Sequence, residues 1–152
     1  MEGSTGDDRI LVRTVFVVAA IRAVPRGAYW VAMQGVHVTL AEFFANRGVK
    51  ATIPFLEGDK PFRAGEQDPQ IRPMVESDLI MIEGSYSEPE LMTRIEAAKR
   101  SGKPIVFLRQ ESSKIQNRIM FDEAFRWVFE YRNYIALSRE LRTWFDTSVR
   151  TA

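Results

Sequence analysis

The chain has no cysteine, a single histidine and only a small excess of positive charge. The absence of cysteine excludes disulfides, thiol catalysis and cysteine-ligated zinc. One histidine, His37, gives little support for a histidine-rich metal site or a Ser-His-Asp triad, and we expect neither a metal nor a cofactor. A net charge of +1, with acidic and basic residues mixed along the chain, argues against an extended nucleic-acid surface.

Long hydrophobic runs are also missing. The longest apolar run, Val15 to Ile21, is far too short to span a bilayer, and Arg13 and Arg22 bracket it closely. It lacks the small-residue cleavage pattern of a signal peptide. We therefore expect no membrane association and a cytoplasmic location, with which the absence of cysteine agrees.

The composition that is present is that of a globular protein, with 45% hydrophobic and 27% charged residues. A chain of 152 residues is long enough for one domain with one core. Residues 1–9 are rich in glycine, serine and aspartate, and we expect a disordered tail there. The remainder, residues 10–152, is expected to be a single domain, because it contains no internal repeat and no interdomain linker.

Apolar, β-branched segments alternate with segments of helical periodicity. The expected strands are 10–21, 49–55, 79–82, 104–108 and 127–131, and the expected helices are 29–46, 68–76, 87–101, 112–125 and 134–145. Strands buried on both faces are typical of a parallel sheet that helices cover on each side. The pattern predicts an α/β fold, a flavodoxin- or Rossmann-like three-layer sandwich with a five-stranded parallel sheet.

A fold of this kind binds its ligands beyond the carboxyl ends of the strands, here in segments 20–27, 56–67 and 83–90. Arg22 follows the first strand directly. Its guanidinium could hold a phosphate or a carboxylate, and the alternative is a surface arginine at a strand end. Helix N-termini at this edge also favour an anion.

Three hydroxyl-bearing residues and a carboxylate follow the third strand. Ser85, Tyr86 and Ser87 could bind phosphate or ribose, although Ser87 by itself is more simply a helix N-cap. Ser87 and Glu90 also match the capping box S-x-x-E, in which the glutamate bonds back to the N-cap amide. In the alternative interpretation, Glu90 faces the pocket as a nucleophile or base.

Five stretches, in their order and spacing, point to a family. They are VFVVAAIRA, RGVKATIP, VESDLIMIEG, RIEAAKRSGKPIVFL and FRWVFEYRNYIALSRELRTWF. Together, from about residue 15 to residue 145, they resemble the nucleoside 2-deoxyribosyltransferase superfamily, in particular the 2'-deoxynucleoside 5'-phosphate N-hydrolases. The first stretch is similar to a strand that ends in a Ser-Ile-Arg-type phosphate loop, with Arg22 in the matching place.

The resemblance implies cleavage of an N-glycosidic bond in a nucleotide. In that family a glutamate on the helix before Gly-Lys-Pro attacks the anomeric carbon, where the transition state is cationic. A loop serine and the helix N-terminus hold the 5'-phosphate, and an aspartate upstream of the third strand supports the site. The resemblance also implies a homodimer with its pocket beside the neighbouring subunit, for which Tyr29, Trp30 and residues 125–127 could supply apolar contacts.

The chain differs from the family at the positions that correspond to the nucleophile and to the phosphate-binding serine. An ungapped match through Gly-Lys-Pro places the nucleophile at Arg94 and the phosphate-loop serine at Glu88. An arginine cannot attack the sugar and would put positive charge beside a developing cation. The small residue one turn earlier becomes Glu90, which could have taken over the attack, or could pair with Arg94 and so be held ionised as a poor nucleophile.

The aspartate upstream of the third strand falls on Gln70 in the same match, with Asp68 two places away. Asp68 could therefore reach the site, or it could be the N-cap of its own helix. We expect a nucleotide-binding domain whose glycosidase activity is open, with a nucleotide or another phosphate-bearing small molecule near Arg22 and residues 85–87. The alternatives are an active nucleoside 5'-monophosphate N-glycosidase that uses Glu90, or a TIR-like signalling or protein-interaction domain.

Overall fold

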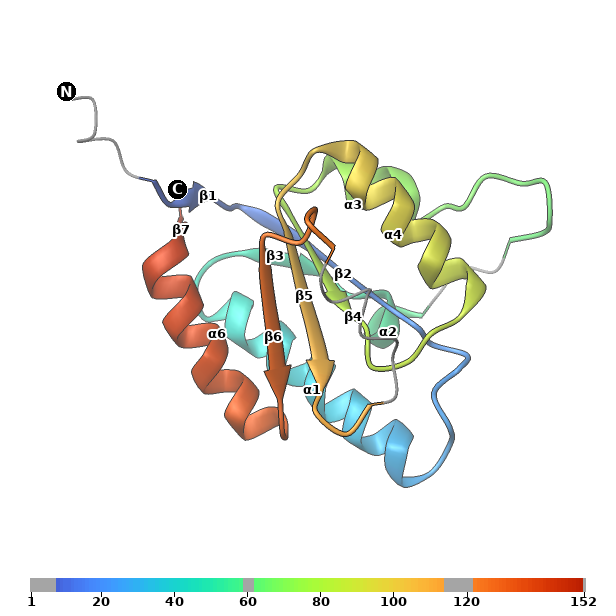
Figure 1. Ribbon diagram of the computed structural model, residues 1–152, viewed down its shortest axis with the longest axis horizontal. Helices are drawn as coiled ribbons and strands as arrows, with labels where there is room; N and C mark the ends of the chain where they lie inside the picture. The colour runs from blue at the N-terminus through green and yellow to red at the C-terminus, as the bar shows by residue number, and fades with distance from the viewer. Residues whose placement is uncertain (1–7, 59–61, 114–121, 152) are drawn as a thin grey trace.

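The central sheet has five parallel strands in the order β3-β2-β4-β5-β6. The computed structural model describes residues 8–58, 62–113 and 122–151 of the chain (Figure 1). The strands are β2 (Thr14–Ala19), β3 (Lys50–Thr52), β4 (Leu79–Glu83), β5 (Ile105–Gln110) and β6 (Trp127–Tyr131). The predicted fold class, an α/β sandwich with a five-stranded parallel sheet, is confirmed.

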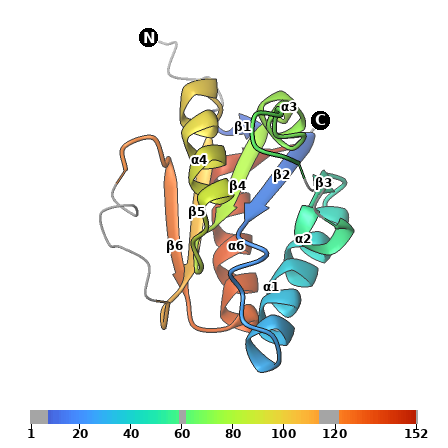
Figure 2. The same ribbon diagram turned by 90° about the vertical axis from the view of Figure 1, so that its right-hand side faces the viewer.

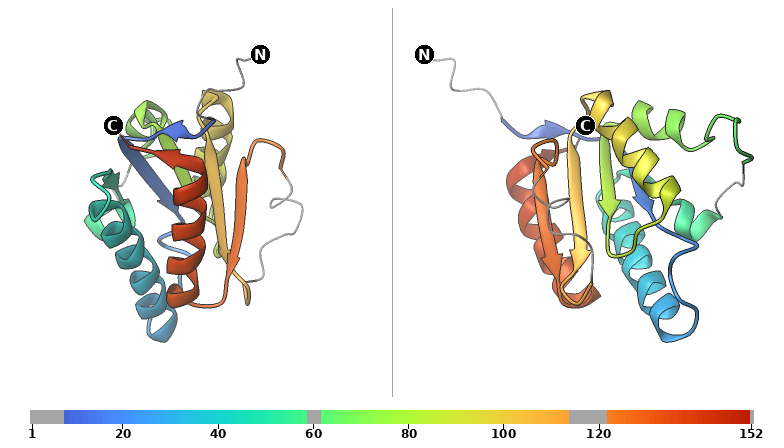
Figure 3. Two further views of the ribbon diagram at one scale, coloured as in Figure 1. Left: turned by 90° about the vertical axis from the view of Figure 1, so that its left-hand side faces the viewer. Right: turned by 45° about the vertical axis from the view of Figure 1, so that its right-hand side comes forward.

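Helices cover both faces of this sheet. They are α1 (Ala28–Ala45), α2 (Pro54–Glu57), α3 (Ile71–Glu76), α4 (Pro89–Ser101) and α6 (Tyr134–Ser148). Helices α1 and α6 lie side by side on one face, and α3 and α4 lie on the other (Figure 2 and Figure 3). No helix among the described residues is both long and apolar enough to cross a membrane.

The alternation of side chains along each strand divides the core in two. Val15 and Val17 of β2 pack with α1 and α6, whereas Phe16 and Val18 pack with α3 and α4. A strand that packs against helices on both faces must be apolar at nearly all of its positions. β4 is such a strand, because all of its residues are buried. The two cores pack against opposite faces of the sheet and so fix the positions of its carboxyl ends.

The first predicted strand, 10–21, is in fact two strands. β1 (Ile10–Leu11) pairs with β7 (Val149–Arg150) in a separate two-stranded sheet, near the ends of the described chain (Figure 1). Between β1 and β2, the backbone N–H groups of Arg13 and Thr14 donate to the carboxylate of Asp78, at 2.8 and 3.1 Å. These bonds anchor the chain where it passes from one sheet to the other.

Other predicted boundaries shift where a proline begins a helix. Pro54 starts α2, so β3 is shorter than the predicted strand, and Pro89 starts α4 two residues later than predicted. The helix predicted over 112–125 falls mostly on residues 114–121, which lie outside the described residues, as do residues 1–7 of the predicted tail.

Candidate functional site

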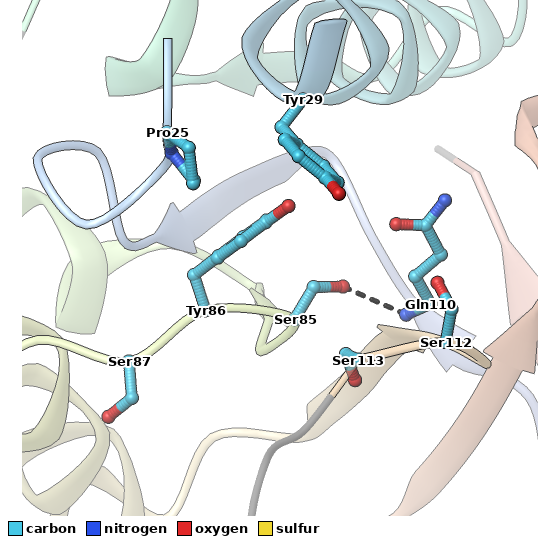
Figure 4. A pocket seen from close by; sticks show the side chains of 8 residues that line it. All are labelled: Pro25, Tyr29, Ser85, Tyr86, Ser87, Gln110, Ser112 and Ser113. Atoms are coloured by element: carbon cyan, nitrogen blue, oxygen red, sulfur yellow. Dashed lines mark hydrogen bonds between the residues drawn. The ribbon is translucent and has the colours of Figure 1, made fainter.

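A pocket lies beyond the carboxyl ends of β2, β4 and β5, the edge where parallel sheets bind ligands. Its volume is about 510 Å³, which is within the usual range for small-molecule sites. The pocket is lined by Pro25, Tyr29, Ser85, Tyr86, Ser87, Gln110, Ser112 and Ser113 (Figure 4). The loop residues predicted from the sequence, 85–87, are therefore part of one cavity.

Two tyrosines and one amide dominate the lining. Tyr29, on the first turn of α1, is 63% exposed, and its ring reaches into the pocket from one side. Tyr86, in the loop after β4, approaches from the opposite side, and burial raises its phenol pKa, with a further contribution from Tyr29 (Figure 4). Gln110, the last residue of β5, adds a side-chain amide with both donor and acceptor atoms.

A buried carboxyl group, Glu83, ties together the strand ends below this pocket. Its Oε1 accepts a hydrogen bond from the backbone N–H of Ser85 at 2.7 Å, and its Oε2 accepts from the hydroxyls of Ser85 at 2.7 Å and Tyr131 at 2.5 Å. Ser85 Oγ in turn accepts from the backbone N–H of Gln110 at 2.8 Å (Figure 4). The network connects the ends of β4, β5 and β6.

Burial decides the protonation behaviour of this network. The side chain of Glu83 is 1% exposed, and burial raises the pKa of its carboxyl, although its hydrogen bonds from Tyr131 and Ser85 act in the opposite direction. Burial and the adjacent Glu83 also raise the pKa of the Tyr131 phenol. Glu83 therefore keeps its proton to a higher pH than an exposed glutamate.

The loop after β4 passes very close to β5. A Cβ atom on Gly84 would lie 2.3 Å from the ring of Phe107, which is far inside contact distance. Phe107 cannot give way easily, because its ring stacks on Phe125 with centroids 4.8 Å apart. Glycine at position 84 therefore allows Ser85 to reach both Glu83 and the backbone of β5.

Glu88 holds the loop after β2 against the loop after β4. Its Oε1 accepts hydrogen bonds from the backbone N–H groups of Ile21 at 2.9 Å and Ala23 at 3.0 Å, and its side chain is buried. Glu88 is also the N-cap residue of α4, but its side chain makes no capping hydrogen bond. The capping box predicted between Ser87 and Glu90 is therefore wrong, because α4 begins one residue too late for it.

Glu90 is bound to Arg22. Arg22 Nη1 donates to Glu90 Oε1 at 3.1 Å, and the two side chains are 56% and 30% exposed. This contact joins the loop after β2 to the first turn of α4, next to the Glu88 contact. The expected pairing of Glu90 with Arg94 is wrong, since the structure gives each of them another partner.

Arg94 lies on the buried side of α4 and binds Asp68. Its Nε donates to Asp68 Oδ2 at 2.7 Å and its Nη2 to Oδ1 at 3.1 Å, a two-point contact between side chains that are 3% and 4% exposed. Asp68 Oδ1 also accepts from the backbone N–H of Gln70 at 2.9 Å. Asp68 thus anchors the start of α3 to α4.

The described pocket lining includes three of the seven residues singled out from the sequence, namely Ser85, Tyr86 and Ser87. The other four are absent from this described lining and form the two ion pairs Arg22–Glu90 and Asp68–Arg94. Glu83, Gln110 and Tyr131 were not predicted from the sequence as site residues, nor was Tyr29 as a pocket residue. Each of the first three ends a strand, so position at the carboxyl end was the signal that could have found them.

Comparison with known proteins supports the fold. No protein-family model matches the chain, and no curated protein matches it in sequence. The solved structure of the Clostridium botulinum CMP N-glycosidase BcmB is similar, with a TM-score of 0.59 and 16% identity over 86% of this chain and 98% of that one. At this identity the likeness concerns the fold alone.

Two further solved structures are less similar. A putative pilus assembly-related protein from Burkholderia pseudomallei has a TM-score of 0.49 and 16% identity, over 91% of this chain and 93% of that one. A conserved protein from Enterococcus faecalis has a TM-score of 0.43 and 11% identity, over 93% and 92%.

Proposed function

We propose that this chain is a binding domain of the nucleoside 2-deoxyribosyltransferase-like fold, which holds a nucleobase-bearing small molecule without cleaving its N-glycosidic bond. The observation that carries the proposal is the position of Arg94 and its contact with Asp68. Arg94 stands where the resemblance places the nucleophilic glutamate, and its guanidinium is bound at two points to Asp68 inside the protein.

The pocket has the features that a nucleobase requires. The faces of Tyr29 and Tyr86 offer stacking surfaces for a flat heterocycle. The amide of Gln110 can donate and accept hydrogen bonds at the edge of a base, and the hydroxyls around it suit a sugar. The volume of about 510 Å³ is large enough for a ligand of nucleoside size.

The carboxylates of this region are engaged in structural contacts. Glycosidic attack needs an ionised carboxylate directed at the anomeric carbon. Asp68 and Glu90 are held by arginines, and Glu88 is held by two backbone N–H groups. Glu83 is buried and hydrogen bonded, and burial favours its protonated form. None of these four is thus presented as a free nucleophile.

The active-glycosidase alternative depends on Glu90, and one observation keeps it testable. The Arg22–Glu90 pair is partly exposed, so a ligand could displace the arginine and release the carboxylate. Release of free base from a nucleotide by the native protein, abolished by Glu90→Gln in a folded variant, would establish this alternative.

The deciding experiment combines binding and turnover. The purified protein is titrated calorimetrically with common ribo- and deoxyribonucleosides, their 5'-monophosphates and NAD, and each mixture is then analysed for free base by chromatography. We expect binding of at least one nucleobase-bearing compound and no release of base. Release of base would contradict the proposal, as would the absence of any binding. Cleavage of NAD would favour a TIR-like activity.

A further inference from the structure

The loop after β2 presents three hydrogen-bond donors in consecutive residues. They are the backbone N–H of Ile21, the guanidinium of Arg22 and the backbone N–H of Ala23. Two backbone N–H groups that converge on one oxygen, beside a guanidinium, form a binding arrangement for an oxyanion. The loop continues directly to Pro25 of the pocket lining, so this arrangement borders the candidate site.

The chain fills this arrangement with its own carboxylates. Glu88 Oε1 takes both N–H groups, and Glu90 Oε1 takes the guanidinium, at 3.1 Å. Both glutamates belong to the segment that begins α4, and Glu88 directly follows Ser87 of the pocket lining. The donors that would bind an incoming anion are thus already bonded to two carboxylates of the chain itself.

We propose that Glu88 and Glu90 exclude phosphate from the edge of the pocket, so that the ligand is an unphosphorylated nucleoside. This inference rests on the proposed function and goes beyond it by naming the ligand class. It replaces the expectation, drawn from the sequence, of a phosphate held by Arg22 and residues 85–87.

The physical reason is competition for the same donors. A 5'-phosphate placed against residues 21–23 would have to displace a buried carboxylate, which would then lose two hydrogen bonds. If the carboxylates stayed in place, the phosphate would face like charges within a few ångströms, and such repulsion is strong at a partly buried site. An uncharged ligand meets neither obstacle.

The test compares each nucleoside with its own 5'-monophosphate. Adenosine, cytidine, guanosine, thymidine and the four corresponding monophosphates are titrated calorimetrically into the native protein. We expect at least one nucleoside to bind, with the dissociation constant of its monophosphate about tenfold higher or more, as repulsion between close like charges requires.

Variants then assign the discrimination to the two glutamates. Glu88→Gln removes the charge but keeps an amide oxygen that can accept from Ile21 and Ala23, so the loop geometry is retained. In the double variant Glu88→Gln/Glu90→Gln, we expect the monophosphate-to-nucleoside ratio of dissociation constants to fall by about tenfold or more. Glu96→Gln, which removes an exposed charge from the same helix, should leave the ratio at its native value.

The outcomes separate this inference from the function on which it rests. If the native protein binds a monophosphate as tightly as its nucleoside, the inference is overturned while the proposed function stands. If none of the eight compounds binds, the inference is overturned, and the proposed function is overturned as well only if the wider panel of nucleosides, monophosphates and NAD also fails to bind. An unchanged ratio in the folded double variant also overturns the assignment to Glu88 and Glu90. If the double variant does not fold, the single variant Glu90→Gln is measured in its place, because Glu90 is partly exposed. A monophosphate-to-nucleoside ratio of dissociation constants equal to the native one would then overturn the assignment to Glu90.

Discussion

Arg94 and Asp68 form a buried two-point ion pair, with N–O distances of 2.7 and 3.1 Å, between the middle of α4 and the residues that precede α3. The pair occupies the position at which the resemblance implies a nucleophilic glutamate. This ion pair is the observation on which the proposal of binding without cleavage rests.

The first prediction concerns the stability that depends on this pair. Arg94→Met should lower the free energy of unfolding by about 3–5 kcal/mol, because Asp68 would be left buried and charged without its partner. Urea unfolding measures the change. The double variant Arg94→Met/Asp68→Asn should lose less than Arg94→Met alone. Arg72→Met, which removes an 85% exposed partner of Glu76, is the control and should cost less than about 1 kcal/mol.

The second prediction tests the pocket. Tyr29→Ala should weaken binding of a nucleobase-bearing ligand by about 1–3 kcal/mol through loss of one stacking surface. Its effect on unfolding should be small, since Tyr29 is 63% exposed. Tyr134→Ala removes an exposed tyrosine that lies over Gly35, away from the described pocket lining, and should leave the affinity unchanged. Equal affinities in native protein and Tyr29→Ala would contradict the stacking role.

The third prediction concerns His37, which is fully buried in α1. Burial lowers the pKa of its imidazole from 6.5 to about 4. Between these values the unfolded chain binds a proton that the folded chain does not, so stability falls as the pH drops from 6.5 towards 4. The contribution lost over this window is about 3 kcal/mol.

His37→Phe should remove this acid sensitivity. The new ring can keep the stacking on Phe55, whose centroid lies 4.2 Å from that of the imidazole. Chemical unfolding of both proteins at pH 7, 6, 5 and 4 gives the comparison, and the difference between them should grow in favour of the variant as the pH falls. Parallel pH profiles would show that His37 is not the titrating group.

The fourth prediction concerns Glu83, whose linkage has the opposite sign. Burial raises the pKa of its carboxyl above 4.5, so the folded chain holds a proton that the unfolded chain releases. This contribution to stability is complete below the unfolded pKa and is lost as the pH rises through the folded one. Glu83→Gln is permanently neutral, so its stability relative to the native protein should rise with pH above 4.5. A constant difference from pH 5 to pH 9 would contradict a raised pKa.

The fifth prediction is the homodimer implied by the resemblance. Of the side chains expected to supply its contacts, Tyr29 is exposed, but Trp30 stacks on Phe55 at 4.6 Å and Phe125 stacks on Phe107 at 4.8 Å. Light scattering of the native protein over a micromolar dilution series should give the mass of two chains. A monomer throughout this range would exclude the dimer.

The fold could be predicted closely because its determinants are local. The five strands were found from runs of apolar residues, and β6 was predicted with the bounds that the structure has. Two boundaries were misplaced where Pro54 and Pro89 begin helices. Another error has a distant cause, because the N–H groups of Arg13 and Thr14 bind Asp78 from 64 or more residues away. No local pattern indicates such a partner.

The sequence by itself determined which segments form the sheet and which edge carries the candidate pocket, since apolar periodicity and the parallel topology are sufficient for both. Only the tertiary structure decided the partners of the charged residues. Local spacing suggested that Glu90 would cap its helix or pair with Arg94. Instead, the loop after β2 supplies Arg22, and Asp68 reaches Arg94 from 26 positions earlier in the chain. A buried charge is stable only beside a donor or an opposite charge, and the packing of distant elements determines which one is within reach.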